Sequence, residues 1–405
     1  MGGVYVHIPF CRTHCTYCGF YSELLRDARG SECFVDALCR EIESMGVTAR
    51  GTGGQEGLLP PWRQGDCRRQ LGGPPRKRWE GSLPDPLCRG LESKLNTLYF
   101  GGGTPSQLSL GQMERILSCL GGGPWDEFTV EVNPDDIAAN GPEYALGLRR
   151  LGVSRISMGI QSFDDAVLKR MGRRHSASEA VKAYEILRLA GFDNISVDFI
   201  FGFQAGMDAE ALGRGLDSLH GGLPEHISCY QLSIEEGSGL GKMVEKGLYA
   251  MPEDSECERQ YLSLCDELRS RGYEHYEISN WAQPGRRSRH NSSYWNHSPY
   301  IGYGPGAHSL FVDGGRFVRR WNNPDLRSYL DAAGSGAFDT VRGEETLTPE
   351  QIREERIMLG LRTEEGIPSS LVGDNSVLVA SPVPGNVRIP ENRWFISDSI
   401  ICNLI

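Results

Sequence analysis

Three cysteines near the N-terminus are the residues most able to do chemistry in this sequence. Cys11, Cys15 and Cys18 lie in the segment HIPFCRTHCTYCGFYS with the spacing C-x3-C-x2-C, and no fourth cysteine follows nearby. A structural zinc site needs a fourth Cys or His at a recognisable spacing, and neither His7 nor His14 fits a finger or a ribbon. Iron–sulfur clusters are normally held by four thiolates. Three thiolates would therefore leave one iron open to an outside ligand.

Further polar or small residues come at the ends of predicted strands. The glycine-rich turn YFGGGTPS (99–106) lets the backbone approach a ligand closely, and its N–H groups can hold a carboxylate or an amine. Glu131 ends a strand in VEVNP, and its carboxylate can accept both hydroxyls of a ribose. Gln161, Arg173 and Asp198 also lie at or after strand ends. Because barrel active sites collect at the carboxyl ends of strands, these side chains can converge on one cavity.

The elements that position these residues alternate between strands and helices. Short segments rich in β-branched and aromatic residues predict strands at 4–8, 97–100, 128–132, 154–160, 195–201 and 226–234. Helical patterns cover 23–45, with Ser22 as a candidate N-cap, then 107–120, 141–151, 164–190 with a break near Arg173, 208–220 and 253–271. Strands that alternate with helices indicate an α/β fold with a parallel sheet. Right-handed crossovers would curl it into a full or partial barrel, and an open doubly wound sheet is the alternative.

Composition bounds the class of protein. The net charge of -11 argues against nucleic acid as the main partner, because phosphate binding needs concentrated Lys and Arg. No apolar run approaches the length of a membrane helix. The chain enters a strand at once, so we expect no signal or transit peptide and a bacterial cytoplasmic location. The 12 cysteines are scattered irregularly, which favours a reducing compartment over a disulfide framework.

The cysteine motif resembles that of the radical S-adenosylmethionine (SAM) superfamily. The motif follows the first strand and has an aromatic residue, Tyr17, just before the third cysteine. The resemblance implies a partial (β/α)6 TIM-like barrel with a smaller C-terminal α+β or winged-helix-like domain. It also implies that Cys11, Cys15 and Cys18 bind a [4Fe-4S] cluster and that SAM chelates the fourth iron. Reduction of such a cluster cleaves SAM to a 5′-deoxyadenosyl radical.

Longer motifs resemble the oxygen-independent coproporphyrinogen III oxidase group of that superfamily. YVHIPFCRTHCTYCGFYS, LYFGGGTPS, GVSRISMGIQSFDDAVLKRMGRRHS, VDFIFG and HISCYQLSIEEGS match it in order, over roughly residues 4–310 apart from an insertion. By this resemblance, the residues expected to contact SAM are Tyr5, Tyr17, Gly102, Gly103, Thr104, Glu131, Gln161, Arg173, Asp198 and Leu232.

Two features resemble the heme chaperone branch of that group rather than the true oxidases. The oxidases have a further cysteine two residues after the third, where this chain has Phe20, and HNSSYW (290–295) resembles the H-N-x-x-Y-W signature of the chaperones. A neutral imidazole is a good axial ligand for heme iron, and aromatic side chains can flank a flat macrocycle. His290 is therefore the first heme-ligand candidate, with His297 and His308 behind it.

The resemblance implies a function in heme handling. We expect a heme chaperone that binds heme, a [4Fe-4S] cluster and SAM, and that delivers heme to an acceptor hemoprotein with an electron donor as a further partner. A peripheral membrane contact during delivery is part of this expectation. The alternative is an oxygen-independent coproporphyrinogen III oxidase, a radical enzyme that decarboxylates propionate side chains, and Phe20 and HNSSYW favour the chaperone. A zinc-bound structural module is the third hypothesis.

The expected domain organisation has three parts. Residues 1–240 form the barrel core, 241–310 a barrel-closing extension with HNSSYW, and 311–405 a small C-terminal domain that is shortened relative to the family. Within the core, residues 51–92 are crowded with Gly, Pro and Arg and predict a long, poorly ordered insertion.

Overall fold

The computed structural model of the chain describes residues 2–25, 27–46, 87, 95–203, 208–373 and 375–405. The predicted insertion at 51–92 lies outside the described residues, apart from Leu87.

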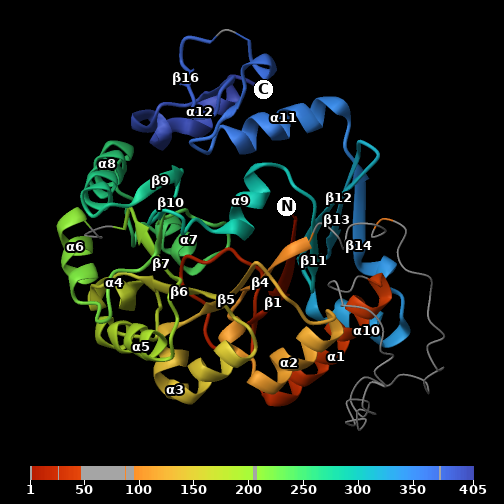
Figure 1. The fold of residues 1–405 in the computed structure, drawn as a ribbon. Coiled ribbons are helices and arrows are strands. Elements are labelled where there is room, and N and C mark those ends of the chain that lie inside the picture. The colour runs from red at the N-terminus through yellow and green to blue at the C-terminus, as the bar shows by residue number, and fades with distance from the viewer. Residues whose placement is uncertain (1, 26, 47–86, 88–94, 204–207, 374) are drawn as a thin grey trace.

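Six parallel strands form the centre of the molecule, and they are the six strands that the sequence predicts. They lie side by side in one sheet in chain order. Helices lie outside this curved sheet (Figure 1), so the predicted partial barrel of α/β class is confirmed. The strands are β1 (Gly2–Ile8), β4 (Leu95–Gly102), β5 (Glu127–Val132), β6 (Arg155–Gln161), β7 (Ile195–Phe201) and β8 (His226–Gln231).

The residue pattern of β6 explains why this sheet can surround a polar cavity. Ile156, Met158 and Ile160 are buried in the hydrophobic core, whereas the alternate residues from Arg155 to Gln161 line a cavity on the other face. Side chains of a strand alternate between its two faces. Parallel strands covered on both faces are usually continuous hydrophobic runs, so polar residues at every second position mark an inner face that is not filled with apolar side chains.

The helices follow the predicted order, but the helix Gly239–Glu245 was not predicted, and the helix predicted at 141–151 begins at Pro134. They are α1 (Ala28–Met45), α2 (Leu110–Cys119), α3 (Pro134–Arg150), α4 (Asp165–Arg170), α5 (Ala177–Leu189), α6 (Ala209–Asp217), α7 (Gly239–Glu245) and α8 (Asp254–Ser270). The break near Arg173 separates α4 from α5, and Ser176 starts α5 with a capping box to Glu179. Glycine in the left-handed region ends this helix at Gly191, with φ of 89°.

The first helix begins later than predicted, and Ser22 is not its N-cap. The N-cap is Asp27, whose side chain accepts a hydrogen bond from Gly30 N. Glu23–Leu24 forms the short strand β3 instead, which pairs with β2 (Phe10–Cys11). The helical periodicity was misleading here, because the backbone N–H groups of Glu23 and Leu25 donate hydrogen bonds to Pro9 O and Cys11 O instead of forming a helix.

Additional strands extend the sheet at both edges. β9 (Glu274–Glu277) and β10 (Asn280–Ala282) follow β8, while β11 (Tyr300–Tyr303) pairs in parallel with β1. Beyond β11 come the antiparallel strands β12 (His308–Asp313), β13 (Arg316–Asn322) and β14 (Arg342–Thr346). The predicted division at residue 310 falls inside β12, so the domain boundaries remain a prediction.

A buried carboxylate joins α1 to this added edge. The Glu41 side chain is fully buried and accepts hydrogen bonds from Gly304 N, Asn322 Nδ2 and Tyr329 Oη, at 2.8, 2.7 and 2.6 Å. Arg342 completes the set with an ion pair at 3.0 Å. Since a buried charge is stable only when paired and hydrogen-bonded, these contacts make the extension part of the same folded body.

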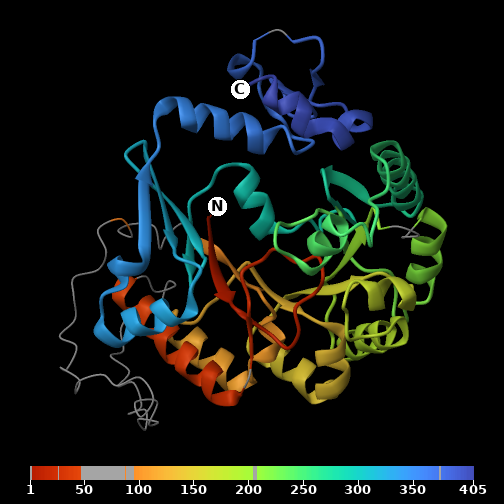
Figure 2. The same ribbon diagram turned by 180° about the vertical axis from the view of Figure 1, so that it is seen from behind.

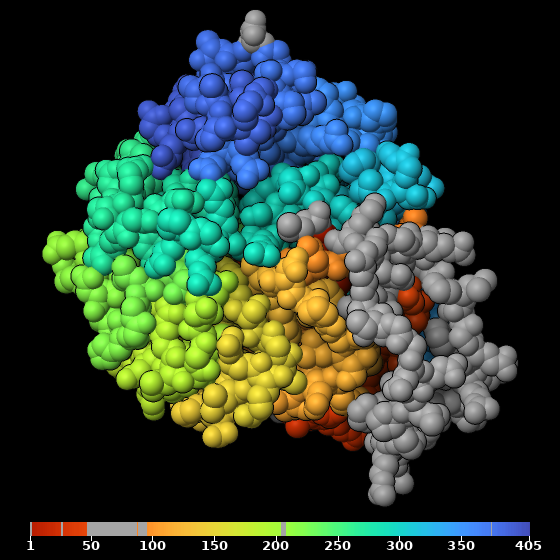
Figure 3. Space-filling view, in the orientation of Figure 1, coloured from red at the N-terminus to blue at the C-terminus, as the bar shows by residue number. Residues whose placement is uncertain are grey.

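The C-terminal residues form a separate layer at one end of the barrel. It contains α11 (Pro349–Gly360), the three-stranded sheet of β15 (Ile367–Pro368), β17 (Asn386–Arg388) and β16 (Val379–Ala380), and α12 (Ser397–Cys402). This layer is at the top in Figures 1 and 2 and appears in dark blue in Figure 3. The remaining helices are α9 (Arg289–Trp295) and α10 (Leu326–Ser335). Among the described residues, no helix is both long and apolar enough to cross a membrane.

Candidate metal-cluster site and its cavity

The three predicted cluster cysteines lie on one loop, residues 11–22, which we name the cysteine loop. Its backbone is fixed from two sides, because Thr16 N donates to Met171 O at 3.0 Å and Thr16 O accepts from Leu240 N at 2.6 Å. The thiols of Cys11 and Cys18 are partly buried, which raises the pKa of both. A bound metal would reverse this, since cations favour the thiolate.

A cavity of about 630 Å³ lies between the cysteine loop and the inner face of the barrel. It brings together the three predicted cluster cysteines and all but one of the residues that the sequence predicts for SAM. Its lining includes Cys11, Cys15, Cys18, Tyr17, Gly102, Gly103, Thr104, Glu131, Gln161, Arg173, Asp198 and Leu232. Tyr5 and His290 lie outside this lining. Their roles as ligands remain predictions.

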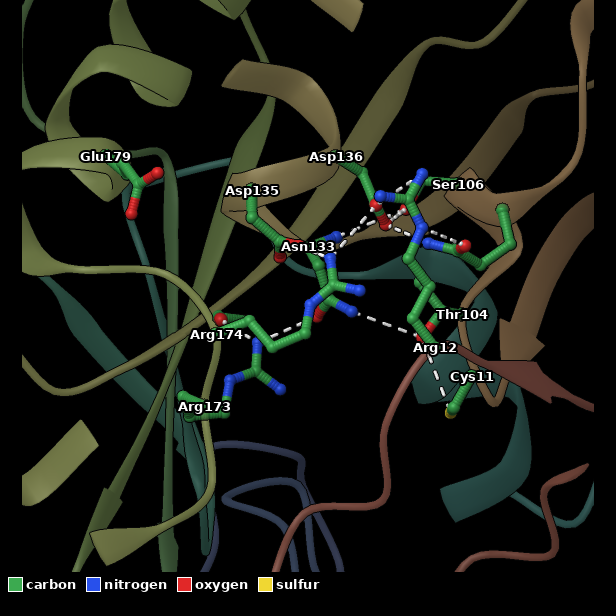
Figure 4. Close-up of polar contacts among 12 residues, drawn as sticks. Cys11, Arg12, Thr104, Ser106, Asn133, Asp135, Asp136, Arg173, Arg174 and Glu179 are labelled. Atoms are coloured by element: carbon green, nitrogen blue, oxygen red, sulfur yellow. Dashed lines mark hydrogen bonds and ion pairs between the residues drawn. The ribbon is translucent and has the colours of Figure 1, made fainter. Parts of the chain in front are cut away.

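A chain of hydrogen bonds connects Cys11 with Cys15, and Figure 4 shows its part from Cys11 through Thr104 and Asn133 to Arg173. Thr104 Oγ1 lies 3.5 Å from Cys11 Sγ and accepts from Asn133 Nδ2 at 3.2 Å. Asn133 Oδ1 accepts from Arg173 Nη2 at 2.7 Å, and Arg173 Nη1 donates to Cys15 Sγ at 3.5 Å. Asn133 therefore holds Thr104 and Arg173 in the positions from which they contact the thiols.

The glycine-rich turn packs against the cysteine side of the barrel. Gly102 has φ of 107°, and a side chain there would meet the His7 ring at 2.6 Å. Its N–H donates to Glu131 Oε2 at 3.1 Å, while Gly103 N donates to Ile8 O at 2.8 Å. These N–H groups are thus already used, so the glycines serve the close packing of β4 on β1 at the cavity wall.

Glu131 is held by two donors inside the barrel. Tyr99 Oη donates to Oε1 at 2.8 Å and Gly102 N to Oε2. Burial raises the pKa of Glu131 to about 7, and the nearby Asp198 carboxylate adds to the shift. Burial also raises the pKa of Asp198, whose oxygens accept from Ser157 and Ser196. Two neighbouring carboxylates in low dielectric favour the protonated forms.

Gln161 has a strained backbone at the end of β6. Its φ of 67° lies in the left-handed region, which is uncommon for a residue other than glycine. Gly159 makes room for it, because a Cβ there would lie 2.7 Å from Gln161 Nε2 and 3.4 Å from Arg173 Nη2. Strain of this kind concentrates at functional sites. At the other wall, Leu232 and Tyr17 pack together in a small hydrophobic cluster.

Tyr5 lies beside the cavity, in the barrel interior. Its hydroxyl is 3.1 Å from His7 Nδ1, and its ring centroid is 6.1 Å from that of Tyr99. It is close enough to Glu131 for that carboxylate to raise its pKa, together with burial.

His290 lies at the opposite end of the barrel from the cysteine loop. It is 1% exposed, with Nδ1 2.9 Å from Thr97 Oγ1 and Nε2 2.9 Å from Tyr294 Oη. Its ring also occupies the space beside Gly3, at the start of β1. Burial lowers the pKa of His290 to about 3. In this conformation both ring nitrogens are engaged, so neither is available to an iron.

The other two heme-ligand candidates also lie away from the cavity. His297 is buried, with Nε2 2.8 Å from Glu355 Oε2, and His308 is exposed beside Trp321. By contrast, His14 is exposed and lines the cavity on the cysteine loop. Its Nδ1 lies 3.2 Å from Ser22 Oγ.

Sequence reasoning missed several residues of the cavity, among them Asn133, Arg155 and Asn291. Asn133 lies within the quoted VEVNP motif, but its partners are remote in sequence. Arg155 is a charged residue inside an apolar strand, a signal that the alternation in β6 makes visible. Asn291 follows His290 in HNSSYW and lines the cavity from α9.

The donor set fits a multi-iron cluster better than a single metal ion. Within the described part of the chain, no three His, Cys, Asp or Glu side chains converge closely enough to hold one metal ion. The three thiols instead line one wall of a cavity that extends away from them. A [4Fe-4S] cluster takes one thiolate per iron, so three spaced thiols and an open cavity suit it.

Comparison with known proteins identifies the class. The family model described as the radical SAM superfamily matches residues 5–210. The chain therefore belongs to the radical SAM superfamily. Within it, the chain is 31% identical to the heme chaperone HemW of Bacillus subtilis (strain 168), over 91% of this chain and 85% of the relative. It is 32% identical to the heme chaperone HemW of a Synechocystis species, over 96% and 85%. It belongs to the family of these proteins, as the motifs predict.

A solved structure supports the fold. The coproporphyrinogen III oxidase HemN from Escherichia coli superposes with a TM-score of 0.67, over 99% of this chain and 89% of that chain. The sequence identity is 17%, so this likeness concerns the architecture alone.

Proposed function

We propose that this protein is a heme chaperone that carries a [4Fe-4S] cluster and SAM and delivers heme to an acceptor hemoprotein. The observation that carries the proposal is the identity of 31% and 32% to two proteins named heme chaperone HemW over about nine tenths of the chain. Cys11, Cys15 and Cys18 would hold the cluster. When reduced, the cluster would supply the electron that cleaves SAM.

The cavity residues have defined tasks in this proposal. The ionised Glu131 accepts the ribose hydroxyls of SAM. Arg173 and Asn133 fix Thr104 and the cysteine loop through the hydrogen bonds between them. The strained Gln161 presents its amide to the cavity, and Leu232 gives the cavity an apolar wall.

The mouth of the cavity suits a flat apolar molecule such as heme. Phe20 lines the cavity with 77% of its surface exposed, and Leu24 on the same segment is 45% exposed. Ile234 is 37% exposed, on a segment that touches the cysteine loop where Gly19 meets Glu235. Exposed apolar side chains gathered around a cavity mark a binding surface. We place the macrocycle against Phe20 at this mouth.

Two histidines compete as the axial ligand of heme in this proposal. His290 would need to give up one of the two hydrogen bonds of its ring, which contributes about 1 kcal/mol to stability. His14 already lines the cavity beside Phe20 on the cysteine loop. Heme spectra of His14→Ala and His290→Ala proteins decide between them: the variant that loses the wild-type Soret band identifies the ligand.

A matched pair of variants tests the heme surface. We expect Phe20→Ala to weaken heme binding by about tenfold, because an aromatic side chain contributes roughly 1.5–3 kcal/mol when buried by a ligand. Leu189→Ala is the control, since Leu189 is equally exposed but lies at the end of α5. Equal heme affinity in the two variants would remove Phe20 from the proposed surface.

The second candidate is an oxygen-independent coproporphyrinogen III oxidase. It is favoured by the set of predicted SAM residues that line one cavity and by the fold shared with HemN. One paired assay separates the two functions. Stable heme uptake without porphyrin product in the presence of SAM and a reductant supports the chaperone, whereas product formation without heme uptake overturns it. The acceptor, the electron donor and any peripheral membrane contact are part of the proposal.

A further inference from the structure

Arg155 is a buried cation inside the barrel. It is the first residue of β6, it is 1% exposed, and it lines the cavity. Among the described residues, neither its Nε nor its Nη1 has a hydrogen-bond partner. Leaving a buried charged donor unsatisfied costs several kcal/mol. Such groups are rare in folded proteins unless a ligand, an ion or water completes them.

The neighbouring carboxylates do not fill this role. Arg155 is close enough to Glu131 and Asp198 to favour their ionised forms. Yet no hydrogen bond among the described residues joins Arg155 to either carboxylate. Glu131 accepts from Tyr99 Oη and a backbone N–H, and Asp198 accepts from serine hydroxyls. The guanidinium therefore contributes charge to the barrel while its donors remain available.

Other donors line the same cavity. Asn291 reaches its lining from α9, and Ser228 and Tyr230 reach it from β8. The backbone N–H of Asn291 is used, by Ser288 Oγ, but no hydrogen bond among the described residues takes its side-chain amide. A guanidinium, an amide and hydroxyls around one space are the groups that recognise a carboxylate.

We infer that Arg155, with Asn291, forms a carboxylate-binding subsite at the inner part of the cavity. The carboxylate comes from a ligand that enters past the cysteine loop. Two sources share this chemistry: a propionate side chain of heme, which rests on the proposed function, and the methionyl carboxylate of a SAM molecule other than the one that chelates the cluster. A purely structural arginine would have its donors paired within the fold, as Arg188 does with Glu225, Leu223 O and Phe192 O.

The test compares heme with heme dimethyl ester and SAM with decarboxylated SAM, so that each pair differs in the carboxylate. Wild-type protein, Arg155→Gln and Arg155→Lys are reconstituted anaerobically, and their folding and iron content are checked. Dissociation constants are then measured for heme, heme dimethyl ester, SAM and decarboxylated SAM. Arg12→Gln is the matched control, because Arg12 lines the same cavity but has its own partners in Gln107 and Asp136.

The quantity that should change is the ratio of the dissociation constants of a ligand with and without its carboxylate. The preference of the wild type for one acid over its carboxylate-free form should fall by about tenfold or more in Arg155→Gln, which is the size of a lost charge-assisted hydrogen bond. It should remain in Arg12→Gln. A fall for heme identifies the propionate, and a fall for SAM identifies the methionyl group.

Failure has separate signatures for the two proposals. If both ratios are unchanged in Arg155→Gln, the subsite is refuted and water completes the guanidinium. If that variant does not fold, Arg155→Lys decides: an ammonium lacks the planar fork, so unchanged ratios there also refute the subsite. Absence of heme binding by the wild type overturns the proposed function alone, because the SAM comparison still tests Arg155.

Discussion

The pKa of Glu131 makes SAM binding dependent on pH. Burial and the Asp198 carboxylate raise this pKa to about 7, so in the folded protein Glu131 carries its proton below that pH and loses it above. Only the ionised form can accept hydrogen bonds from two ribose hydroxyls with both oxygens. The affinity for SAM should therefore rise with pH through neutrality.

The magnitude follows from the titration curve. With a pKa of about 7, roughly a tenth of Glu131 is ionised at pH 6 and about nine tenths at pH 8. The dissociation constant for SAM should thus be about tenfold larger at pH 6 than at pH 8. In Glu131→Gln this pH dependence should be absent, and affinity at pH 8 should fall by roughly ten- to a hundredfold, the value of charge-assisted hydrogen bonds.

The assay is equilibrium dialysis of labelled SAM against reconstituted protein at pH 6, 7 and 8 at constant ionic strength. The amino group of SAM also titrates in this range, so the informative quantity is the ratio of the dissociation constants of wild type and Glu131→Gln at each pH. A ratio that does not change with pH, in variants with full iron content, would refute the reasoning.

Three further predictions concern the cluster, the cavity and stability. Cys15→Ala should lose the brown chromophore and the roughly four irons of the wild type; an iron assay that finds a full cluster would contradict the ligand assignment. Gly159→Ala should keep its iron but weaken SAM binding by about tenfold, because the new Cβ displaces Gln161 and Arg173; unchanged dialysis constants would show that neither contacts SAM. Glu41→Ala should lower the free energy of unfolding by about 3–5 kcal/mol in urea titrations, the cost of removing the buried carboxylate that pairs with Arg342 and accepts from Gly304 N, Asn322 and Tyr329. A loss below about 1 kcal/mol would mean that water replaces the carboxylate.

The sequence predicts the barrel well because its strands carry a local signal. Each of the six has a short apolar pattern that tertiary contacts reinforce, as the buried Ile156, Met158 and Ile160 of β6 show. The predicted start of α1 was wrong, because the residues that form β3 and pair with β2 have a local periodicity that is typical of a helix. Register with a remote strand is a tertiary property.

The cavity, too, could be predicted from the sequence only in part. The strand-end rule places Glu131 and Gln161 in one lining, since parallel strands finish at the same edge. Asp198 lies in the middle of β7 and still lines the cavity. The strand-end rule does not reveal that the N–H of Gly102 is taken by Glu131, because that depends on φ of the glycine and on packing against His7. Nor does the HNSSYW motif reveal which side chain faces the ligand, as the helical turn points Asn291 and not His290 into the cavity.

The pairing of β1 with β11 has a consequence for biosynthesis. One edge of β1 pairs with β4. The other edge pairs with β11 (Tyr300–Tyr303), which lies nearly three hundred residues later in the chain. Contacts of such high sequence separation form slowly, and an unpaired strand edge is a template for association with other chains. A ribosome-bound chain therefore exposes the strand that leads into its cluster ligands until most of the protein has been made. Insertion of the cluster into a properly closed barrel should then be a late event in maturation, after Tyr300–Tyr303 has been made and has paired with β1.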